Sequence, residues 1–308
     1  MTAESAISIG ICTHNRARQL ADTLDSLLPQ AEAHGRCEVI VVANACTDDS
    51  VATARSAAND YPGAACRIVT LPEPSLSAAR NTVVHQAAGD VTLFLDDDAS
   101  PLPGWIDAYS HAFADNRVGG AGGFISLEYA VGPPWWISPA MAQMLTEVDW
   151  GEAERPLNHP KEWIAGANMG FRTQLLRRHH FSEKLGRRGA SLMSGEETHL
   201  CWRLIREGWK IMYVPSAAVV HRVPKNRLTA SFMLARAYAG GRSTSIIEHD
   251  VLGPTQTLKR LPGILRSCAV STARMALSDD QTMRPQLAVE SARSRGRLTG
   301  AVRSLLPV

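Results

Sequence analysis

Residues 91–98 read Val-Thr-Leu-Phe-Leu-Asp-Asp-Asp, and this stretch decides the fold we expect. The apolar run is typical of a buried strand, and the turn-forming residues 100–104 follow it. Three adjacent carboxylates repel one another, so they are tolerated mainly where a divalent cation or bound donors offset their charge. Hard oxygen ligands suit magnesium or manganese. The stretch therefore predicts metal-assisted chemistry on a phosphorylated substrate, unless the acids merely end a strand and open a turn.

The pattern of strand followed by helix also occurs upstream of this stretch. Short apolar or β-branched runs predict strands at residues 7–12, 38–43 and 67–71. Helical periodicity and turn residues predict helices at residues 18–28, from the turn at 44–49 to about residue 58, and at 77–88. Such alternation with short links predicts an α/β fold with a doubly wound, mainly parallel sheet flanked by helices.

Composition places the chain among ordinary globular proteins. Its 308 residues are 45% hydrophobic and 20% charged, and the formal charge of +2 gives no signature of nucleic-acid binding. Residues 1–10 lack the features of a signal peptide, and no apolar run is long enough for a transmembrane helix. The six cysteines lack paired zinc spacing, which favours reduced thiols and a cytoplasmic location.

Polar side chains follow the predicted strands where ligands bind in doubly wound sheets. Thr13, Asn15 and Arg16 follow the first strand, and Asn44 follows the second. They offer donors for phosphate and acceptors for a ribose or base, although each is also typical of a helix cap or a solvated first turn. Neither a Gly-x-Gly-x-x-Gly sequence after the first strand nor a Gly-Lys-Ser/Thr loop is present, which argues against dinucleotide oxidoreductases and P-loop enzymes.

An ordered set of motifs resembles family 2 glycosyltransferases over about residues 7–240. In the first half, the motifs that carry the resemblance are residues 12–16, 38–44, 77–81 and 95–98. In the second half they are residues 166–172, 195–204, 214–215 and 221–223. The resemblance implies a GT-A fold and an inverting transfer from a nucleotide-diphosphate sugar, usually a UDP-sugar, to an acceptor hydroxyl.

The resemblance also implies roles for individual residues. Asp98, Asp96 and His221 match the ligands of a Mn²⁺ or Mg²⁺ ion on the donor diphosphate. The nucleotide contacts implied are Thr13, Asn15, Arg16, Asn44, Arg80, Asp96 and Asp97. Ala43 departs from the family pattern, because many members have Asp there; Asn44 is the expected substitute, since an amide both donates and accepts.

The second half is expected to supply the base and the acceptor site. Glu197 aligns with the family's catalytic aspartate, and Glu196 is its rival. Without the resemblance, both acids are read as first-turn residues that complement a helix dipole. Trp163, Gly166 and Asn168 are predicted to contact the acceptor or the sugar, although core packing explains a tryptophan equally well.

The predicted organisation is a catalytic domain over residues 1–224 and a helical, basic region over 225–308. Within the catalytic domain, residues 1–104 form the nucleotide-sugar half and 105–224 the acceptor half. A helix is expected from residue 228 to 239, with Gly240-Gly241 as its stop. Residues 255–308 carry nine Lys or Arg and three Asp or Glu, which favours peripheral attachment at the inner face of a membrane or, alternatively, self-association or a cover over the catalytic domain.

Two other classes of protein share part of this pattern. A nucleotidyltransferase that forms sugar nucleotides shares the strand-end aspartates, but residues 13–16 lack the glycines expected of its triphosphate loop. A non-catalytic protein that binds sugar nucleotides or glycans is the third reading. The acceptor is left open among glycan, glycolipid and small molecule, and cell-envelope or polysaccharide synthesis is the expected setting.

Overall fold

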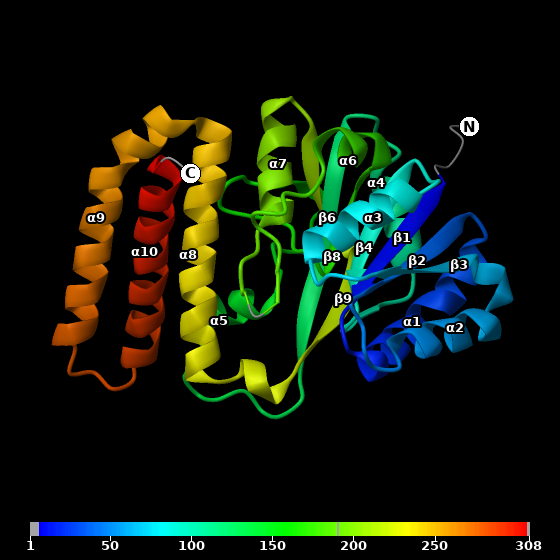
Figure 1. Cartoon of the computed structure of the whole chain (residues 1–308), viewed down its shortest axis with the longest axis horizontal. Helices are drawn as coiled ribbons and strands as arrows, with labels where there is room; N and C mark the ends of the chain where they lie inside the picture. Colours follow the sequence, from blue (N-terminus) through cyan, green and yellow to red (C-terminus); the bar gives the residue numbers. More distant parts are fainter. Residues whose placement is uncertain (1–5, 190, 307–308) are drawn as a thin grey trace. The chain divides into compact units, whose positions relative to one another are not determined.

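The computed structural model describes residues 6–189 and 191–306, which fall into two compact units (Figure 1). The first unit comprises the chain up to Glu128 together with Thr146–Glu183 and Leu200–Arg222. The second comprises Tyr129–Leu145, Lys184–His199 and the chain from Val223 onward. We predicted one boundary, at residue 224; the division here also assigns two internal connections to the second unit.

The first unit is built on a sheet flanked by helices, which confirms the predicted GT-A-like α/β class, but the sheet is mixed rather than mainly parallel. Four parallel strands stand in the order β3-β2-β1-β4, with bounds β3 (Cys66–Leu71), β2 (Cys37–Asn44), β1 (Ile7–Thr13) and β4 (Val91–Asp96). The sheet continues through β8 (Asn168–Arg172), β6 (Val118–Tyr129), β9 (Lys210–Val223) and β5 (Ala99–Pro101). The β4–β8, β6–β8 and β5–β9 pairs are antiparallel, and β7 (Arg155–Pro156) pairs antiparallel with β9.

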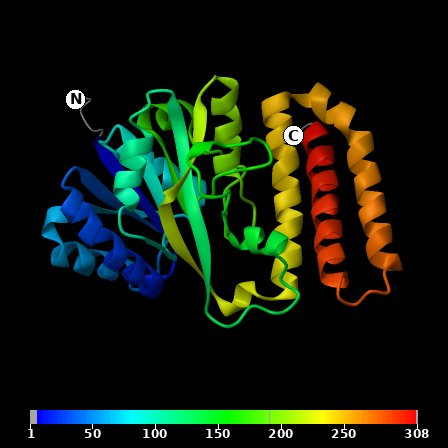
Figure 2. The ribbon, with the colours of Figure 1, turned by 180° about the vertical axis from the view of Figure 1, so that it is seen from behind.

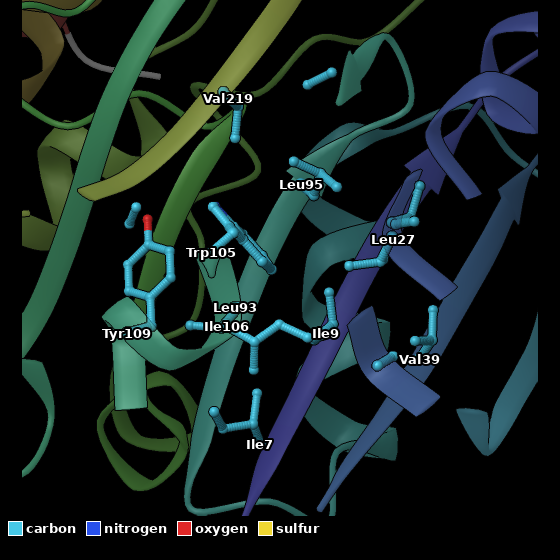
Figure 3. Close-up of a cluster of buried hydrophobic side chains, with 14 of the residues drawn as sticks. Ile7, Ile9, Leu27, Val39, Leu93, Leu95, Trp105, Ile106, Tyr109 and Val219 are labelled. Carbon is cyan, nitrogen blue, oxygen red and sulfur yellow. The ribbon is translucent and has the colours of Figure 1, made fainter. Parts of the chain in front are cut away.

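Helices cover both faces of this sheet, because the strands are apolar on both sides. Alternate residues of β2 divide between two buried clusters, with Val39 and Val41 in one and Ile40 and Val42 in the other. The first cluster includes residues of α1 (Ala17–His34), α2 (Ser50–Asp60) and α4 (Trp105–Ala112), and Figure 3 shows part of it. The second includes residues of α3 (Leu76–Gln86), α6 (Thr173–His179) and α7 (Glu196–Arg206).

Short elements complete the connections between the main strands and helices. They are the 3₁₀ turns η1 (Pro62–Ala64), η2 (Gln143–Leu145) and η3 (Lys225–Arg227), and the single-turn helix α5 (Pro139–Ala142). The six cysteines are present as thiols.

The second unit contains three long helices. They are α8 (Ala230–Leu252), α9 (Pro254–Leu277) and α10 (Arg284–Leu305), and α10 lies between the other two (Figures 1 and 2). None of the helices in the described part of the chain is long and apolar enough to cross a membrane.

Our prediction that Gly240-Gly241 ends a helix is wrong, because α8 continues for eleven residues beyond Gly241. The reason is a close contact between helices. A Cβ atom added at Gly241 would lie 2.0 Å from the carbonyl oxygen of Arg293 on α10, and one added at Gly296 would lie 2.0 Å from that of Tyr238 on α8. The glycines therefore allow two helix backbones to approach closely, which is their other common use in helices.

Candidate metal and nucleotide site

The acidic triplet lies where the order of the parallel strands reverses. β1 pairs with β2 on one side and with β4 on the other, and Cys12 stands opposite Asp96 in the β1–β4 register. Thr13 stands opposite Ala43 in the β1–β2 register, so the turns after all three strands emerge at one edge of the sheet. This edge, at the carboxyl ends of parallel strands, is where ligands bind in such sheets.

Asp96, Asp98 and His221 form a group with the composition and spacing of a metal site. One ligand atom from each residue lies within 4.8 Å of those of the other two. The β5–β9 pairing brings them together, because Ala99 stands opposite His221 and the Arg222 amide donates to the Asp98 carbonyl at 2.8 Å. His221 Nε2 lies 3.2 Å from Asp98 Oδ1, and both residues are buried.

The three side chains fit a divalent cation. Two carboxylates and an imidazole form a donor set that suits manganese and is acceptable to magnesium. His221 is only 1% exposed, and Nε2 is the ring nitrogen that faces Asp98 Oδ1. Nε2 is therefore the atom through which His221 would bind a cation held by the two carboxylates.

Arg16 neutralises part of the triplet's charge. Its Nη1 atom lies 2.8 Å from Asp97 Oδ1 and 2.8 Å from Asp98 Oδ2. Burial lowers the pKa of Arg16, but Asp97 and Asp98 raise it more, so it stays above its usual value. Burial raises the pKa of Asp97 to about 6 against the opposing effect of Arg16. Asp97 therefore faces Arg16 inside the protein, which differs from the nucleotide contact predicted for it.

Arg80 supplies a second buried guanidinium beside the triplet. It is 3% exposed, and its Nη2 donates to Asp96 Oδ1 at 3.3 Å and to the Gly166 carbonyl at 3.2 Å. Its guanidinium carbon lies 5.8 Å from the ring centroid of Phe181. Three carboxylates thus face two guanidinium groups, which leaves one negative charge for a cation to balance.

Gly166 belongs to this arrangement through its backbone. A Cβ atom added there would lie 2.3 Å from Arg80 Nη2, so only glycine allows the guanidinium to reach the carbonyl. The glycine that we predicted to contact the acceptor or sugar therefore positions Arg80.

Hydrogen bonds join the turn after β1 to the turn after β2. Asn15 has a φ of 53°, and its Oδ1 accepts from the Thr47 amide at 2.7 Å. Asn44 is nearly buried, its Oδ1 accepts from the Ser75 amide at 3.1 Å, and its carbonyl lies 2.6 Å from His14 Nδ1. The predicted nucleotide turns are therefore adjacent and fixed by polar contacts.

Asn168, which we predicted to contact the acceptor or sugar, is a structural residue here. It is fully buried, and its Oδ1 accepts from Trp105 Nε1 and the Tyr109 hydroxyl at 2.8 Å each. Its Nδ2 donates to the carbonyls of Phe124 at 3.1 Å and Ala217 at 2.6 Å. The amide has no exposed surface with which to touch a sugar.

Trp163 is half-buried and packs edge-on against Trp150, with ring centroids 4.8 Å apart. The Trp150 indole also donates to the Trp163 carbonyl at 2.9 Å. Trp163 thus takes part in core packing, which is the alternative to the predicted contact with a sugar.

Glu196 and Glu197 lie in the second unit, at the start of α7. Gly195 precedes them with a φ of +99°, a backbone conformation that favours glycine. Glu196 is 2% exposed, whereas Glu197 is half-buried. Burial lowers the pKa of Arg236 on α8, and the charges of Glu197 and Glu196 oppose this effect.

Two residues that support the site lie within the turn 44–49 and the motif 77–81, but we predicted no individual role for either. Thr47 holds Asn15, as described above. Asn81 on α3 brackets Phe181, because its Nδ2 donates to the Phe181 carbonyl at 3.1 Å and its Oδ1 accepts from the Phe181 amide at 2.8 Å. An asparagine inside a helix, where it is unfavourable, was the available signal.

The fold and this acidic edge define a class, the glycosyltransferases of GT-A architecture. The model of the family described as "Glycosyltransferase like family 2" matches residues 5–241, and the chain belongs to this family.

Two curated relatives agree with this assignment. The chain is 30% identical over 169 residues to the pre-mycofactocin glycosyltransferase of Mycobacterium tuberculosis, covering 53% of this chain and 34% of that protein. It is 25% identical over 241 residues to the succinoglycan biosynthesis protein ExoM of Rhizobium meliloti, covering 77% and 73% of the two chains. The chain thus spans about a third of the mycobacterial relative.

Two solved structures share the fold. The mannosyltransferase PcManGT of Pyrobaculum calidifontis, in complex with GDP-Man and Mn²⁺, aligns with a TM-score of 0.59 at 18% identity, over 98% of this chain and 74% of that one. TarS of S. aureus, in complex with UDP-GlcNAc, aligns with a TM-score of 0.53 at 16% identity, over 96% and 91%.

Proposed function

We propose that the chain transfers a sugar from a nucleotide-diphosphate sugar to an acceptor hydroxyl with the assistance of a divalent cation. The observation that carries this proposal is the group formed by Asp96, Asp98 and His221 in a chain of glycosyltransferase family 2. The complexes of PcManGT with GDP-Man and Mn²⁺ and of TarS with UDP-GlcNAc support a donor of this chemical class.

Asp96, Asp98 and His221 would hold Mn²⁺ or Mg²⁺. When bound, such an ion neutralises charge on a diphosphate leaving group. Arg80 and Arg16 add positive charge beside the triplet, and we propose that they help to orient the phosphates. Thr13, Asn15 and Asn44, at the adjoining turns, are the proposed contacts to the nucleoside, with a uridine nucleotide as the proposed donor.

We propose Glu197 as the base that takes the proton from the acceptor hydroxyl in a single inverting displacement. Its exposure favours it over Glu196, because a base must reach a proton of the bound acceptor and Glu196 is almost fully enclosed. The hydroxyl oxygen then attacks the anomeric carbon, and the bond from that carbon to the nucleoside diphosphate breaks.

The donor site is tested by calorimetry and thermal shift with UDP-, GDP- and dTDP-sugars, with and without Mn²⁺. We expect one nucleotide sugar to raise the melting temperature of the wild-type chain only with metal, since preferential binding to the native state stabilises it. Asp98→Asn should abolish the shift, whereas Asp107→Ala, which removes an exposed carboxylate, should retain it. A metal-independent shift, or one that survives Asp98→Asn, would refute the metal-assisted donor site.

The base is tested separately from donor binding. Glu197→Gln should reduce turnover by at least about a hundredfold while the donor affinity stays unchanged, since general bases contribute about 10²–10⁴-fold. Glu196→Gln is the matched control and should retain more of the rate. Equal losses in the two variants would contradict the assignment, and a chain that binds donor without any turnover would be a binding protein.

A further inference from the structure

The helical part of the second unit contains a cavity of about 340 Å³ lined by residues of α9 and α10. Its lining includes Lys259, Arg260 and Ser267 from α9 and Ser294 and Arg297 from α10. All five of these side chains can donate a hydrogen bond to an anion. Ammonium and guanidinium groups only donate, and serine hydroxyls can donate. None of these residues belongs to the metal and nucleotide site described above.

One carboxylate from α8 holds two of the three cations in place. Arg297 Nη2 donates to both oxygens of Glu248 at 2.9 Å, and Arg260 Nη1 lies 3.1 Å from Glu248 Oε1. Lys259 has neither an ion pair nor a hydrogen bond with any residue that the structure describes. Three positive charges therefore share one negative charge, and the cavity keeps an excess of two.

Helix α9, which lines one side of the cavity, extends this charge. It carries four basic residues and lacks Asp and Glu along Pro254–Leu277. Its exposed Leu258 and Leu265 lie on the face of the helix opposite to Gly263 and Ser267, because successive residues are about 100° apart around a helix. The cavity is therefore distinguished by its charge and its hydroxyl groups.

We propose that this cavity binds the phosphate group of a second ligand, distinct from the sugar donor. A phosphate carries the charge and the oxygen acceptors that match two guanidinium groups held in place, a neighbouring ammonium group and two hydroxyls. Glu248 orients Arg260 and Arg297 before the ligand arrives, which lowers the ordering cost of binding. The phosphate comes either from an anionic lipid headgroup or from a soluble phosphoester, and the experiment below distinguishes these two sources.

The test uses the full chain with a chelator present, so that the metal-assisted donor site does not contribute. The probes are sn-glycerol 3-phosphate, followed by calorimetry, and phosphatidylcholine vesicles with or without phosphatidylglycerol, followed by flotation. Lys259→Ala removes a charge from the cavity wall. Arg266→Ala is the matched control, because it removes an exposed charge from the same helix without altering the cavity lining.

We expect Lys259→Ala to weaken binding of the probe by about tenfold or more, as for loss of one hydrogen bond between charged groups, and Arg266→Ala by less than about twofold. Ser294→Asp, which places a negative charge in the cavity, should abolish binding. Flotation with the phosphatidylglycerol vesicles that is lost in Lys259→Ala and kept in Arg266→Ala identifies a lipid source. Binding of glycerol phosphate without flotation identifies a soluble source.

Equal weakening in Lys259→Ala and Arg266→Ala would overturn the proposal, because a diffuse basic surface responds to total charge rather than to position. Failure of the wild-type chain to bind either probe would also overturn it. Neither result bears on the transferase proposal, since no step of this test uses a sugar nucleotide or a metal ion.

Discussion

Substitution by alanine should change the free energy of unfolding in opposite directions at two adjacent glycines of α8. Gly240 and Gly241 both lie inside the helix, where alanine is intrinsically better than glycine by about 0.5–1 kcal/mol. A Cβ atom at Gly240 would meet nothing within 4 Å. Gly240→Ala should therefore stabilise the second unit by about 0.5–1 kcal/mol.

Gly241→Ala meets the backbone of the neighbouring helix. Its Cβ atom would lie 2.0 Å from the Arg293 carbonyl oxygen and 2.8 Å from the Arg297 amide nitrogen, while carbon–oxygen contacts normally begin near about 3.3 Å. Helices α8 and α10 must separate by roughly 1 Å, and overpacking of this kind costs about 1–3 kcal/mol. The two variants should differ by about 1–3 kcal/mol, because both gain the same helix propensity and only Gly241→Ala incurs the steric cost.

Hydrogen exchange of peptides from α8 and α10 measures this difference within the second unit. Exchange should become slower in Gly240→Ala and at least about fivefold faster in Gly241→Ala than in Gly240→Ala, since about 1.4 kcal/mol is a factor of ten. Urea unfolding followed by circular dichroism provides a second readout. Equal effects of the two substitutions, or destabilisation by Gly240→Ala, would refute the close approach of the two helices.

Three further predictions concern the first unit. Asn168→Ala should destabilise the protein by about 2–6 kcal/mol in urea unfolding, because it leaves two buried donors without an acceptor. Tyr109→Phe should then cost less in the Asn168→Ala background than in the wild type, and additive losses would contradict the shared network. His221→Ala should weaken Mn²⁺ binding at least about tenfold in calorimetry without a donor, and unchanged affinity would remove His221 from the metal site. Burial raises the pKa of Glu38, but hydrogen bonds from Ser8 and the Ala88 amide and the charge of Arg67 lower it more, so its net pKa is depressed. The stability that Glu38 contributes is thus present above its unfolded pKa and is lost as pH falls through its folded pKa. The difference in urea midpoint between the wild type and Glu38→Gln should therefore become smaller on acidification. A difference that persists at low pH would contradict this prediction.

The alternation of strands and helices was predictable from the sequence, because it depends on local signals. Apolar runs predicted the four parallel strands to within a residue or two, and turn residues marked their ends. The acidic triplet stood out for the same reason, since Asp96 and Asp98 directly follow such a run. Asn168 and the glycine pair were misread, because a buried amide network and a close helix contact leave no distinct mark in a single sequence.

The sequence by itself determined the layered α/β architecture, the location of the acidic turn and the family motifs. Only the tertiary structure decided that Asp98 faces both Arg16 and His221, that Arg80 reaches Asp96 past Gly166, and that a basic cavity lies between α9 and α10. The physical reason is distance along the chain. Local periodicity records which face of a strand or helix is buried, whereas the β5–β9 pairing that brings His221 to Asp98 joins segments far apart in sequence, and it forms only when the sheet assembles.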